Sequence, residues 1–504
     1  MQTAAITGSL GAEAIAAKLF SALDDRQIRV PMATIGSPKN SLTLCLQGDD
    51  QELAESLIKE VATQTGMADH ILHVHVDNDA ALVTIVGEGM VNHPGIAARF
   101  ASAMGRCGIN IKAMAQGAEE INITVVVSRS EATRALQAAH AGFYLSPQSL
   151  RVGILGRTPV ATKLLQLFLR AEKSLKDMKV ELLIAGQYAD GSVTRHSEIH
   201  HLEATATSQA SPEPLSKFIK DLLLPEWPHS VVIDASSDRT YSEEYQNWLQ
   251  EGLHVITANP FSNAGRIEDY QVVQDTMRRN RRHCLYEATV CGTLPIIETL
   301  ADLSQTGDRV LRLEGMLSGV WGEMLAIHRR SSDLVSMVQA LDIIGITPQQ
   351  VLWALTGSDS IRTLLTLGRE IGVFLEETSV RQSGDWPKEL IPQASQTDLS
   401  WEPLYPHLKR WQDTVARHTG TDENSLYLPI GRISNDGHIS LTLEVISDSH
   451  LMESKRGDCT VAIYTERLGE RPLVIKGPAA GAGPVAGALF ADVLRLTRYL
   501  GSMG

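Results

Sequence analysis

The spacing of hydrophobic positions changes near residue 150. Before this point, residues 8–46 and residues 87–127 each show an amphipathic helix, an alternating strand, a turn and a second alternating strand. Further helices are predicted near residues 51–64 and 131–141, so that each copy has the order βαββαβ. The pattern predicts an internal duplication of a small ligand-binding unit.

After residue 150, short apolar strands alternate with helices. The segments "VGILG", "VELLIAG", "HSVVIDASSD" and "HVITANPFSNAG" are each followed by a helical pattern, which is the βαβ rhythm of a doubly wound parallel sheet. The basic run "RRNRRH" at residues 278–283 is predicted to be a solvated helix end. The run "HSEIHH" at residues 196–201 is predicted to be a loop and not a metal site.

Composition restricts the class of protein. The 504 residues carry a formal charge of −14, which argues against a nucleic-acid partner because phosphate binding depends on an excess of Lys and Arg. Five dispersed cysteines suggest neither a disulfide framework nor a zinc site. Because apolar stretches stay below the roughly 18 residues that cross a membrane, we expect a soluble, cytoplasmic protein of about three domains.

The motifs resemble those of a known family. The second copy near the start resembles an ACT domain, and "TANPFSNAG", "LYEATVCGTLPIIETL", "RLEGMLSGV", "ALTGSDSIRTLL" and "VIKGPAAGAGPVAGALFADVLRL" fall in the order of homoserine dehydrogenase. The chain thus resembles a bifunctional aspartokinase/homoserine dehydrogenase without its kinase domain. The resemblance implies an α/β fold: tandem ACT domains at 1–148, a Rossmann-like nucleotide-binding domain at 149–292 completed by 475–504, and a substrate and dimerisation domain at 293–474.

The turn at Gly156 is where this family holds NADP or NAD. The GxGxxG pattern places its second and third glycines at Thr158 and Ala161, and Pro159 removes a backbone donor from the helix N-terminus. We therefore expect weakened cofactor binding. Arg157 either pairs with a phosphate or is an ordinary exposed turn residue. The resemblance also assigns to the cofactor site Ser236, Asn259 and Gly481.

The resemblance implies hydride transfer between a nicotinamide and aspartate semialdehyde. The family uses two lysines, but this chain has Pro260 and Thr363 at those positions, so no cation stabilises the carbonyl oxygen. The neighbouring Arg362 is expected to point elsewhere, because one residue turns a helix by about 100°. Asp359 is retained, either as a catalytic group or as an acidic residue favoured at a helix N-terminus. The family's tyrosine, glutamate and aspartate are also replaced, by Ile346, Pro348 and Ala354.

Two further ligand sites follow from the resemblance. The family's monovalent-cation loop matches Glu287, Val290, Gly292 and Leu294. An effector-binding glutamine of the ACT domain matches Gln116 in the second copy, whereas the first copy has Ile35. Asn92 and Asn110 flank the helix of the second copy and either reach the effector or cap the helix.

Two classes of function remain open. The first is a pseudoenzyme that senses an amino acid of the aspartate family and regulates an authentic pathway enzyme. The second is a diverged NAD(P)-dependent oxidoreductase whose pocket is rebuilt around Asp359, His328 or Glu323. In both cases we expect a homodimer or a dimer of dimers, because exposed ACT edges and the strands near residues 309–317 and 438–446 need a cover.

Overall fold

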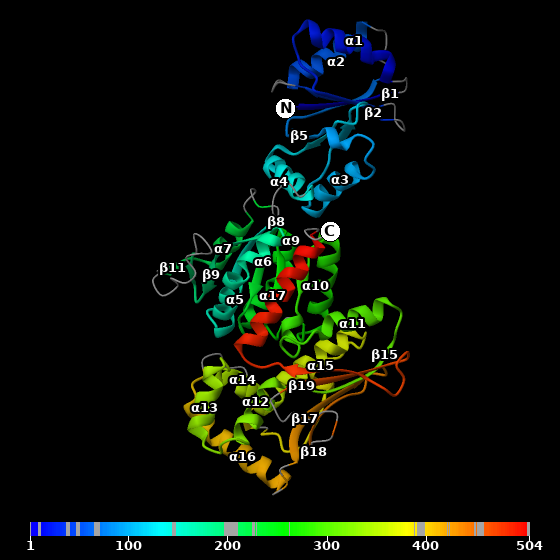
Figure 1. The fold of residues 1–504 in the computed structure, drawn as a ribbon. Helices are drawn as coiled ribbons and strands as arrows, with labels where there is room; N and C mark the ends of the chain where they lie inside the picture. Colours follow the sequence, from blue (N-terminus) through cyan, green and yellow to red (C-terminus); the bar gives the residue numbers. More distant parts are fainter. Residues whose placement is uncertain are drawn as a thin grey trace.

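The computed structural model arranges the chain as three successive units, with the N-terminal strands and helices at one end, a nucleotide-binding type of sheet in the middle and a second large sheet at the other end (Figure 1). It describes residues 2–8, 12–36, 41–46, 51–64, 71–143, 148–195, 210–223, 227, 229–261, 263–387, 389–390, 399–420, 422, 424–447, 450 and 458–500. The predicted loop at residues 196–201 lies outside this part of the chain.

The N-terminal unit contains the predicted duplication. The first copy comprises β1 (Gln2–Gly8), α1 (Ala12–Asp25), β2 (Met32–Gly36), β3 (Ser41–Leu46), α2 (Gln51–Gln64) and β4 (Ile71–Asp77), in the sheet order β2-β3-β1-β4. The second comprises β5 (Ala81–Val86), α3 (Ile96–Arg106), β6 (Ala113–Gln116), β7 (Asn122–Val127) and α4 (Ala132–Gly142), in the order β5-β7-β6. The two sheets adjoin through β2 and β6.

Among the described residues, the second copy does not contain the fourth strand that its pattern predicted. The next strand, β8 (Gln148–Leu155), pairs in parallel with strands of the middle unit instead. Its residues Leu150, Val152, Ile154 and Leu155 are all buried, which suits a central strand covered on both faces rather than an ACT edge.

The middle unit confirms the doubly wound prediction. Its sheet has the order β11-β10-β9-β8-β12-β13-β14. The five strands β9, β8, β12, β13 and β14 run in parallel, whereas β10 and β11 pair antiparallel at the edge. The bounds are β9 (Val180–Ala189), β10 (Ser192–Thr194), β11 (Ser211–Pro212), β12 (His229–Asp234), β13 (His254–Thr257) and β14 (Cys284–Leu285). Helices α5 (Pro159–Arg170) and α17 (Ala482–Tyr499) share one apolar core with the sheet, whereas α7 (Leu215–Leu222) and α9 (Tyr245–Glu251) share the other. The shorter α6 (Glu172–Asp177) and α8 (Arg239–Glu243) and the longer α10 (Ile267–Asn280) complete the unit.

The C-terminal unit is a six-stranded sheet with helices against it. Its order is β16-β18-β17-β15-β19-β20, with bounds β15 (Val310–Met316), β16 (Arg381–Ser383), β17 (Ser425–Ser434), β18 (Ile439–Ser447), β19 (Asp458–Thr465) and β20 (Leu473–Pro478). One large core joins this sheet to α11 (Ile296–Gln305), α12 (Gly319–His328), α13 (Leu334–Ile343), α14 (Pro348–Thr356), α15 (Ser358–Glu370) and α16 (Tyr405–Thr419). From β20 the chain returns to the middle unit as α17, drawn in red in Figure 1.

Two predictions from the sequence, on membrane-spanning helices and on the cysteines, can be compared with the described residues. In the part that the structure describes, the helices fall short of the length and apolarity needed to cross a membrane. All five cysteines are buried as free thiols.

Candidate functional site

The turn after β8 brings two sheet ends into close contact. Gly156 has a φ of +93°, and a Cβ at this position would lie 3.1 Å from the Cβ of Ser236 and 3.3 Å from the carbonyl oxygen of Ala235. Glycine is therefore required here for the approach of the turn that follows β12.

The side chain of Thr158 makes hydrogen bonds to two other parts of the protein. Its hydroxyl accepts a hydrogen bond from the N–H of Ala161 at 3.2 Å and donates one to the carbonyl oxygen of Ala235 at 2.8 Å. Pro159 has no N–H, and the N–H of Thr162 bonds to the carbonyl of Thr158. Among residues 159–162 at the start of α5, this leaves the N–H of Val160 for a phosphate, so Pro159 and Thr158 reduce the number of donors that a helix N-terminus normally presents.

The other predicted cofactor residues also have partners inside the fold. Arg157 donates from Nη2 to Ser192 at 3.1 Å and to Thr194 at 3.2 Å, on the neighbouring strand β10. Gly481 has a φ of +92°, and a Cβ there would lie 2.9 Å from the carbonyl oxygen of Ile344, so this glycine admits a turn of the C-terminal unit. A Cβ at Gly345 would lie 3.0 Å from the Cβ of Pro159, which places the same turn against the start of α5.

A buried network that the sequence analysis did not identify holds Ser236 and Asn259. Asp234, fully buried at the end of β12, accepts hydrogen bonds from the Ser236 hydroxyl at 2.6 Å, the Tyr245 hydroxyl at 2.6 Å and the Asn259 amide at 2.9 Å. Burial raises the pKa of Asp234, although these donors oppose the shift. The network fixes the ends of β12 and β13, and the signal for it was an aspartate directly after the apolar run "VVI".

The predicted substrate site lies where α15 meets the loop after β13. Pro260 begins that loop, and Thr363 is buried on α15. Asp359, one turn before Thr363, accepts hydrogen bonds from the Ser318 hydroxyl and from the N–H of Ser360 at 2.6 Å. Burial raises the pKa of Asp359, although the hydrogen bonds from Ser318 and Ser360 and the charge of Arg362 oppose the shift.

Arg362 supplies a cation to this region. Its guanidinium carbon lies 5.0 Å from the ring centre of Phe261, the residue after Pro260, and 4.5 Å from that of Trp353. Burial lowers its pKa to about 10, while Asp359 opposes the shift. Its Nε and Nη2 are buried without a hydrogen-bond partner among the described residues. The Arg362 guanidinium thus lies against the loop that contains Pro260, whereas the sequence predicted that it points away from this region.

The two other residues proposed for a rebuilt pocket lie elsewhere on α12. His328 packs edge-on against Trp411 of α16 with ring centres 5.7 Å apart. Burial raises the pKa of Glu323, and the charges that act on it come from Arg330 and Asp458. No contact of either residue with Asp359 is present among the described contacts.

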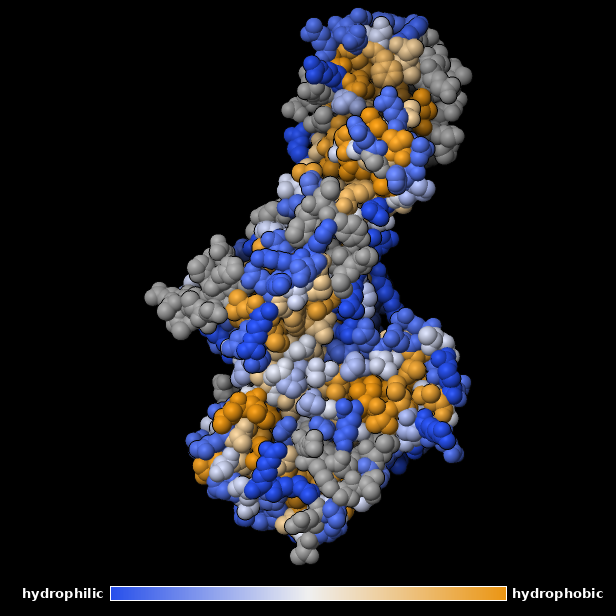
Figure 2. Space-filling view, in the orientation of Figure 1, coloured by the Kyte–Doolittle hydropathy of each residue, from blue (hydrophilic) through white to orange (hydrophobic). Residues whose placement is uncertain are grey.

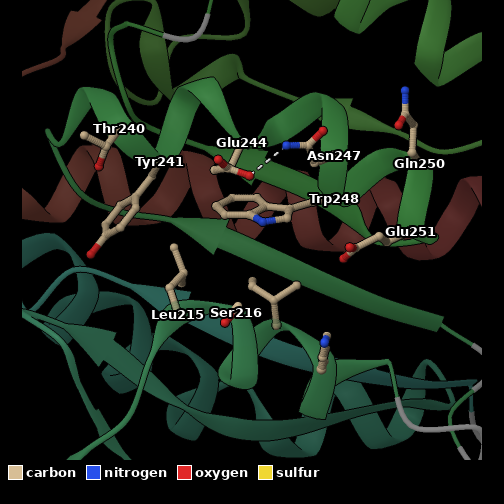
Figure 3. A pocket seen from close by; sticks show the side chains of 11 residues that line it. Leu215, Ser216, Thr240, Tyr241, Glu244, Asn247, Trp248, Gln250 and Glu251 are labelled. Atoms are coloured by element: carbon tan, nitrogen blue, oxygen red, sulfur yellow. Dashed lines mark hydrogen bonds between the residues drawn. The ribbon is translucent and has the colours of Figure 1, made fainter.

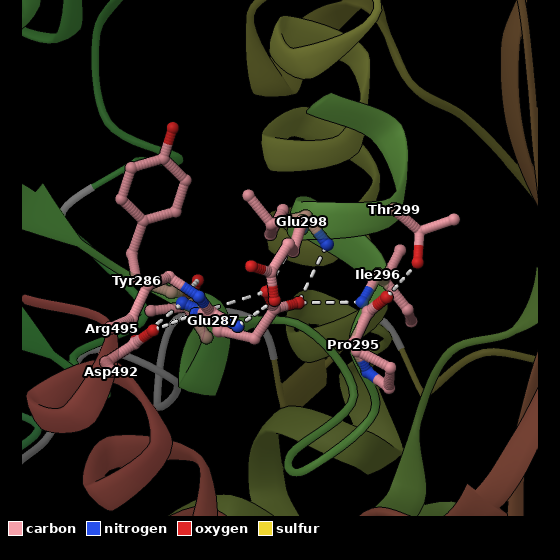
Figure 4. Close-up of polar contacts among 10 residues, drawn as sticks. Tyr286, Glu287, Pro295, Ile296, Glu298, Thr299, Asp492 and Arg495 are labelled. Carbon is pink, nitrogen blue, oxygen red and sulfur yellow. Dashed lines mark hydrogen bonds and ion pairs between the residues drawn. The ribbon is translucent and has the colours of Figure 1, made fainter. Parts of the chain in front are cut away.

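The predicted cation loop contains a cluster of ion pairs, called the joint below, that connects the middle unit to the C-terminal unit. Glu287 accepts hydrogen bonds from the N–H groups of Ile296 and Ile297, both at 2.7 Å, and so caps α11 (Figure 4). Arg495 of α17 pairs with Asp492 and Glu298, and its Nη1 lies 3.7 Å from Glu287.

These partners do not fit a cation bound through the Glu287 carboxylate. Both of its oxygens point at N–H donors, since Oε2 also accepts from the N–H of Glu298 at 3.1 Å. The carbonyl of Leu294 accepts from Ile296, and Gly292, with a φ of +58°, admits the backbone of Ala479. Burial raises the pKa of Asp492 to about 7, despite its pairing with Arg495. The side chain of Glu287 thus serves to join α11 and α17, and a cation bound through the backbone carbonyls of this loop stays a prediction.

The predicted effector residues separate along α3. Gln116 is exposed at the end of β6, and the N–H of Asn92 donates to the Glu120 carboxylate at 2.9 Å in the following turn. Asn110 follows the other end of α3, a helix of 11 residues and so about 16 Å long. Gln116 and Asn92 therefore share one end, and Asn110 lies at the end that faces the middle unit (Figure 1).

A separate groove lies on the middle unit between α7 and the α8–α9 segment (Figure 3). It has a volume of about 500 Å³, and its walls include Tyr241, Trp248, Lys220, Glu244 and Glu251. None of the residues that the sequence assigned to a site lines it.

Three segments match known protein families. Residues 83–143 match the profile of the ACT domain, residues 159–287 that of the homoserine dehydrogenase NAD-binding domain, and residues 295–494 that of homoserine dehydrogenase.

Individual proteins agree with these matches. The chloroplastic bifunctional aspartokinase/homoserine dehydrogenase 2 of Zea mays is 30% identical over 508 residues, which cover 98% of this chain and 54% of the maize protein. The chain spans about half the length of such curated relatives. The solved structure of a putative homoserine dehydrogenase of Archaeoglobus fulgidus superposes with a TM-score of 0.53 at 14% identity. The match covers 69% of this chain and 99% of the Archaeoglobus chain. A hyperthermophilic archaeal homoserine dehydrogenase mutant, solved with NADPH, covers 69% of the chain and 98% of its own with a TM-score of 0.51 at 18% identity.

Proposed function

Because the chain carries the ACT, NAD-binding and homoserine dehydrogenase domains of this family, we propose that it is a pseudoenzyme of aspartate-family amino-acid metabolism. Its dehydrogenase unit does not turn over homoserine, and the chain senses an amino acid and regulates an authentic pathway enzyme. The proposal is carried by Pro260 and Thr363, which stand at the positions where the resemblance implies the two lysines of the family. Hydride arrival at an aldehyde places negative charge on oxygen, and neither residue can supply a compensating cation.

The turn between β8 and α5, where the Thr158 hydroxyl makes its hydrogen bonds within the protein, supports the same proposal. The caps and contacts of Thr158 and Pro159 remove most of the donors that would hold a pyrophosphate. NADP or NAD then binds weakly, and a monovalent cation has no role in the proposed function because Glu287 caps α11.

The direct test is turnover in both directions with NADP(H) and NAD(H). We expect no detectable oxidation of homoserine and no reduction of aspartate semialdehyde. An ordinary enzyme turns over at about 10 s⁻¹, and a rate within about 100-fold of that would overturn the proposal. A catalytically competent homoserine dehydrogenase assayed in the same buffers is the positive control.

One observation favours a second candidate, an NAD(P)-dependent oxidoreductase for a different small molecule. Arg362 places a cation beside Asp359, with Nε and Nη2 unpartnered among the described residues. Such a cation could stabilise a developing oxyanion if a substrate reached it. The candidates differ in cofactor binding, because an oxidoreductase needs micromolar affinity for NADPH at working concentrations and a sensor does not.

The sensing part of the proposal rests on the second N-terminal copy. Its ACT match and exposed Gln116 support binding of threonine, lysine or methionine at the end of α3 that also carries Asn92. Self-association is also proposed, since hydrophobic side chains gather on the visible faces of the N-terminal and C-terminal units (Figure 2). Val445 of β18 and Leu473 of β20 are among the large exposed apolar residues.

The compartment follows from the thiols. Five buried free cysteines suit a reducing compartment. The cytoplasm is one such compartment, whereas the maize relative is a chloroplastic protein.

A further inference from the structure

The basic run at residues 278–283 is only partly a solvated helix end. Arg278 and Arg279 are exposed on the last turn of α10, as the sequence predicted. Arg281 then turns the chain with a φ of +50°, and Arg282 is only 9% exposed. The prediction is wrong for Arg282 because this residue enters the junction between the second N-terminal copy and the middle unit.

Contacts across this junction bring several arginines together. Arg282 donates from Nη1 to the carbonyl of Arg106 at 3.3 Å, and Arg106 donates from Nη1 to the carbonyl of Leu500 at 3.1 Å. A Cβ at Gly105 of α3 would lie 3.8 Å from Nη1 of Arg281, so that guanidinium lies against the helix. The C-terminal ends of α3, α10 and α17 therefore meet at one place.

A cavity of about 490 Å³ opens between these three ends. This volume is in the range of sites for small molecules. No acidic residue is among the described residues that line it, which are Ala101, Ser102, Gly105, Arg106, Arg281, His283, Tyr499 and Leu500.

The positive charge at the junction is not balanced by the described part of the protein. Arg106, Arg281 and Arg282 have no carboxylate within ion-pair distance there, and the Nε of Arg282 is buried without a partner. The nearby Arg134 has one, Glu131, at 4.0 Å. Arg106 and Arg281 are exposed at the cavity, so their guanidinium groups can pair with an anion from solution, whereas the buried Arg282 donates to the carbonyls of Arg106 and Arg281.

One wall of the cavity is aromatic. The ring of His283 stacks on that of Tyr499, with centres 5.0 Å apart and an interplanar angle of 22°. Tyr499 is 51% exposed, so one face of its ring is open. Burial and the charge of Arg282 lower the pKa of His283, which favours the neutral form of its ring. A planar heterocycle stacks favourably on such a face.

We propose that this cavity binds a nucleotide-sized, phosphate-bearing metabolite, with its phosphate held by Arg106 and Arg281 and its planar ring against Tyr499. The site is distinct from the turn at Gly156 and from the ACT end that carries Gln116. It stands independently of the lost dehydrogenase chemistry. Because the ligand touches α3, α10 and α17 at once, its binding ties the sensing copy to the middle unit.

The test is calorimetric titration of the full chain with AMP, pyrophosphate and inorganic phosphate at low salt. We expect AMP to bind at one site per chain at least tenfold more tightly than phosphate. R106Q and R281Q should each weaken AMP binding at least tenfold, while R279Q, a matched exposed change on α10 outside the cavity, should leave it unchanged. R106K retains the charge and should retain part of the affinity, which separates loss of the site from loss of folding.

Each alternative result overturns a part of the proposal. AMP binding that is absent at millimolar concentration, or that is indifferent to Arg106 and Arg281, removes the site. Pyrophosphate binding as tightly as AMP, with the same dependence on both arginines, removes the planar ring from the proposal and assigns the cavity to free phosphates.

Discussion

The hydroxyl of Thr158 donates to the carbonyl oxygen of Ala235 at 2.8 Å, so the residue at the second position of the phosphate turn binds the neighbouring strand end. The same hydroxyl accepts from the N–H of Ala161. The Thr158 side chain thus occupies the N–H of Ala161, one of the donors at the helix N-terminus that would otherwise be available to a pyrophosphate.

Reopening this turn should restore cofactor binding. Replacing Thr158 and Pro159 together with glycine removes the hydroxyl and returns one backbone donor, so NADPH should bind about tenfold more tightly, the value of one to two hydrogen bonds. Replacing the N-cap threonine by glycine should cost only about a few tenths of a kcal/mol of unfolding free energy. Fluorescence titration of NADPH measures the affinity, and Thr162→Ala on the same helix is the control. Unchanged or weaker binding would show that Thr158 belongs to a rebuilt site.

The joint between α11 and α17 should depend on Arg495. This side chain is 14% exposed and lies beside the buried carboxylates of Asp492 and Glu287, so Arg495→Ala leaves both of them without a cation. We expect a loss of about 3–5 kcal/mol in the free energy of unfolding, measured by urea denaturation. Arg498→Ala, exposed on the same helix, should change it by less than about 0.5 kcal/mol. A loss below about 1 kcal/mol for Arg495→Ala would contradict the assignment of the joint.

Acid should destabilise the junction through His229. Burial, with Arg282 and Arg134 nearby, lowers its pKa to about 3, so the folded state keeps it neutral while the unfolded state takes up a proton below about pH 6.5. Stability is therefore fully present above pH 6.5 and is lost progressively as the pH falls toward 3.

The contribution of His229 to the pH dependence of stability is the difference between the wild type and a variant that lacks this histidine. His229→Asn should remove about 1 kcal/mol of the stability loss that denaturation experiments record between pH 7 and 5.5. His438, exposed on a turn of the C-terminal unit, provides the control variant His438→Asn. Equal pH dependence in the wild type and in His229→Asn would rule out this residue as the cause.

Amino-acid sensing should depend on Gln116. A ligand that binds the folded state alone raises stability by about 2.7 kcal/mol at 100 times its dissociation constant, which thermal melting detects readily. Threonine, lysine or methionine should produce such a shift in the wild type, and Gln116→Ala should abolish it without changing the oligomer in light scattering. Asn110→Ala, at the opposite end of α3, should retain the shift. A shift that survives Gln116→Ala, or a monomer in light scattering, would contradict this part of the account.

Periodicity was sufficient for most of the fold because burial on one or two faces leaves a direct pattern in the sequence. The strands at residues 229–234 and 254–257 and the helix at residues 51–64 follow from that pattern alone. The strand at residues 148–155 was assigned to the doubly wound sheet, as the structure has it, whereas the last strand expected of the second N-terminal copy is absent from the described residues, because the apolar pattern does not say where one copy ends.

The site was less predictable because it depends on contacts between distant segments. From the sequence, Arg282 is predicted to be exposed to solvent as part of a basic run. It is buried because it contacts Arg106, which is 176 residues away in the chain. In the same way, the position of Arg362 depends on Phe261 and Trp353, which come from different units. The family motifs located the substituted lysine positions directly, but not what occupies the space around them.

The rate of NADPH oxidation with aspartate semialdehyde at saturating concentrations tests the central claim most directly. The account predicts no rate above the background without protein, since Pro260 and Thr363 leave the carbonyl oxygen without a cation. A protein-dependent rate within about 100-fold of the ordinary 10 s⁻¹, abolished by heat denaturation, would contradict it.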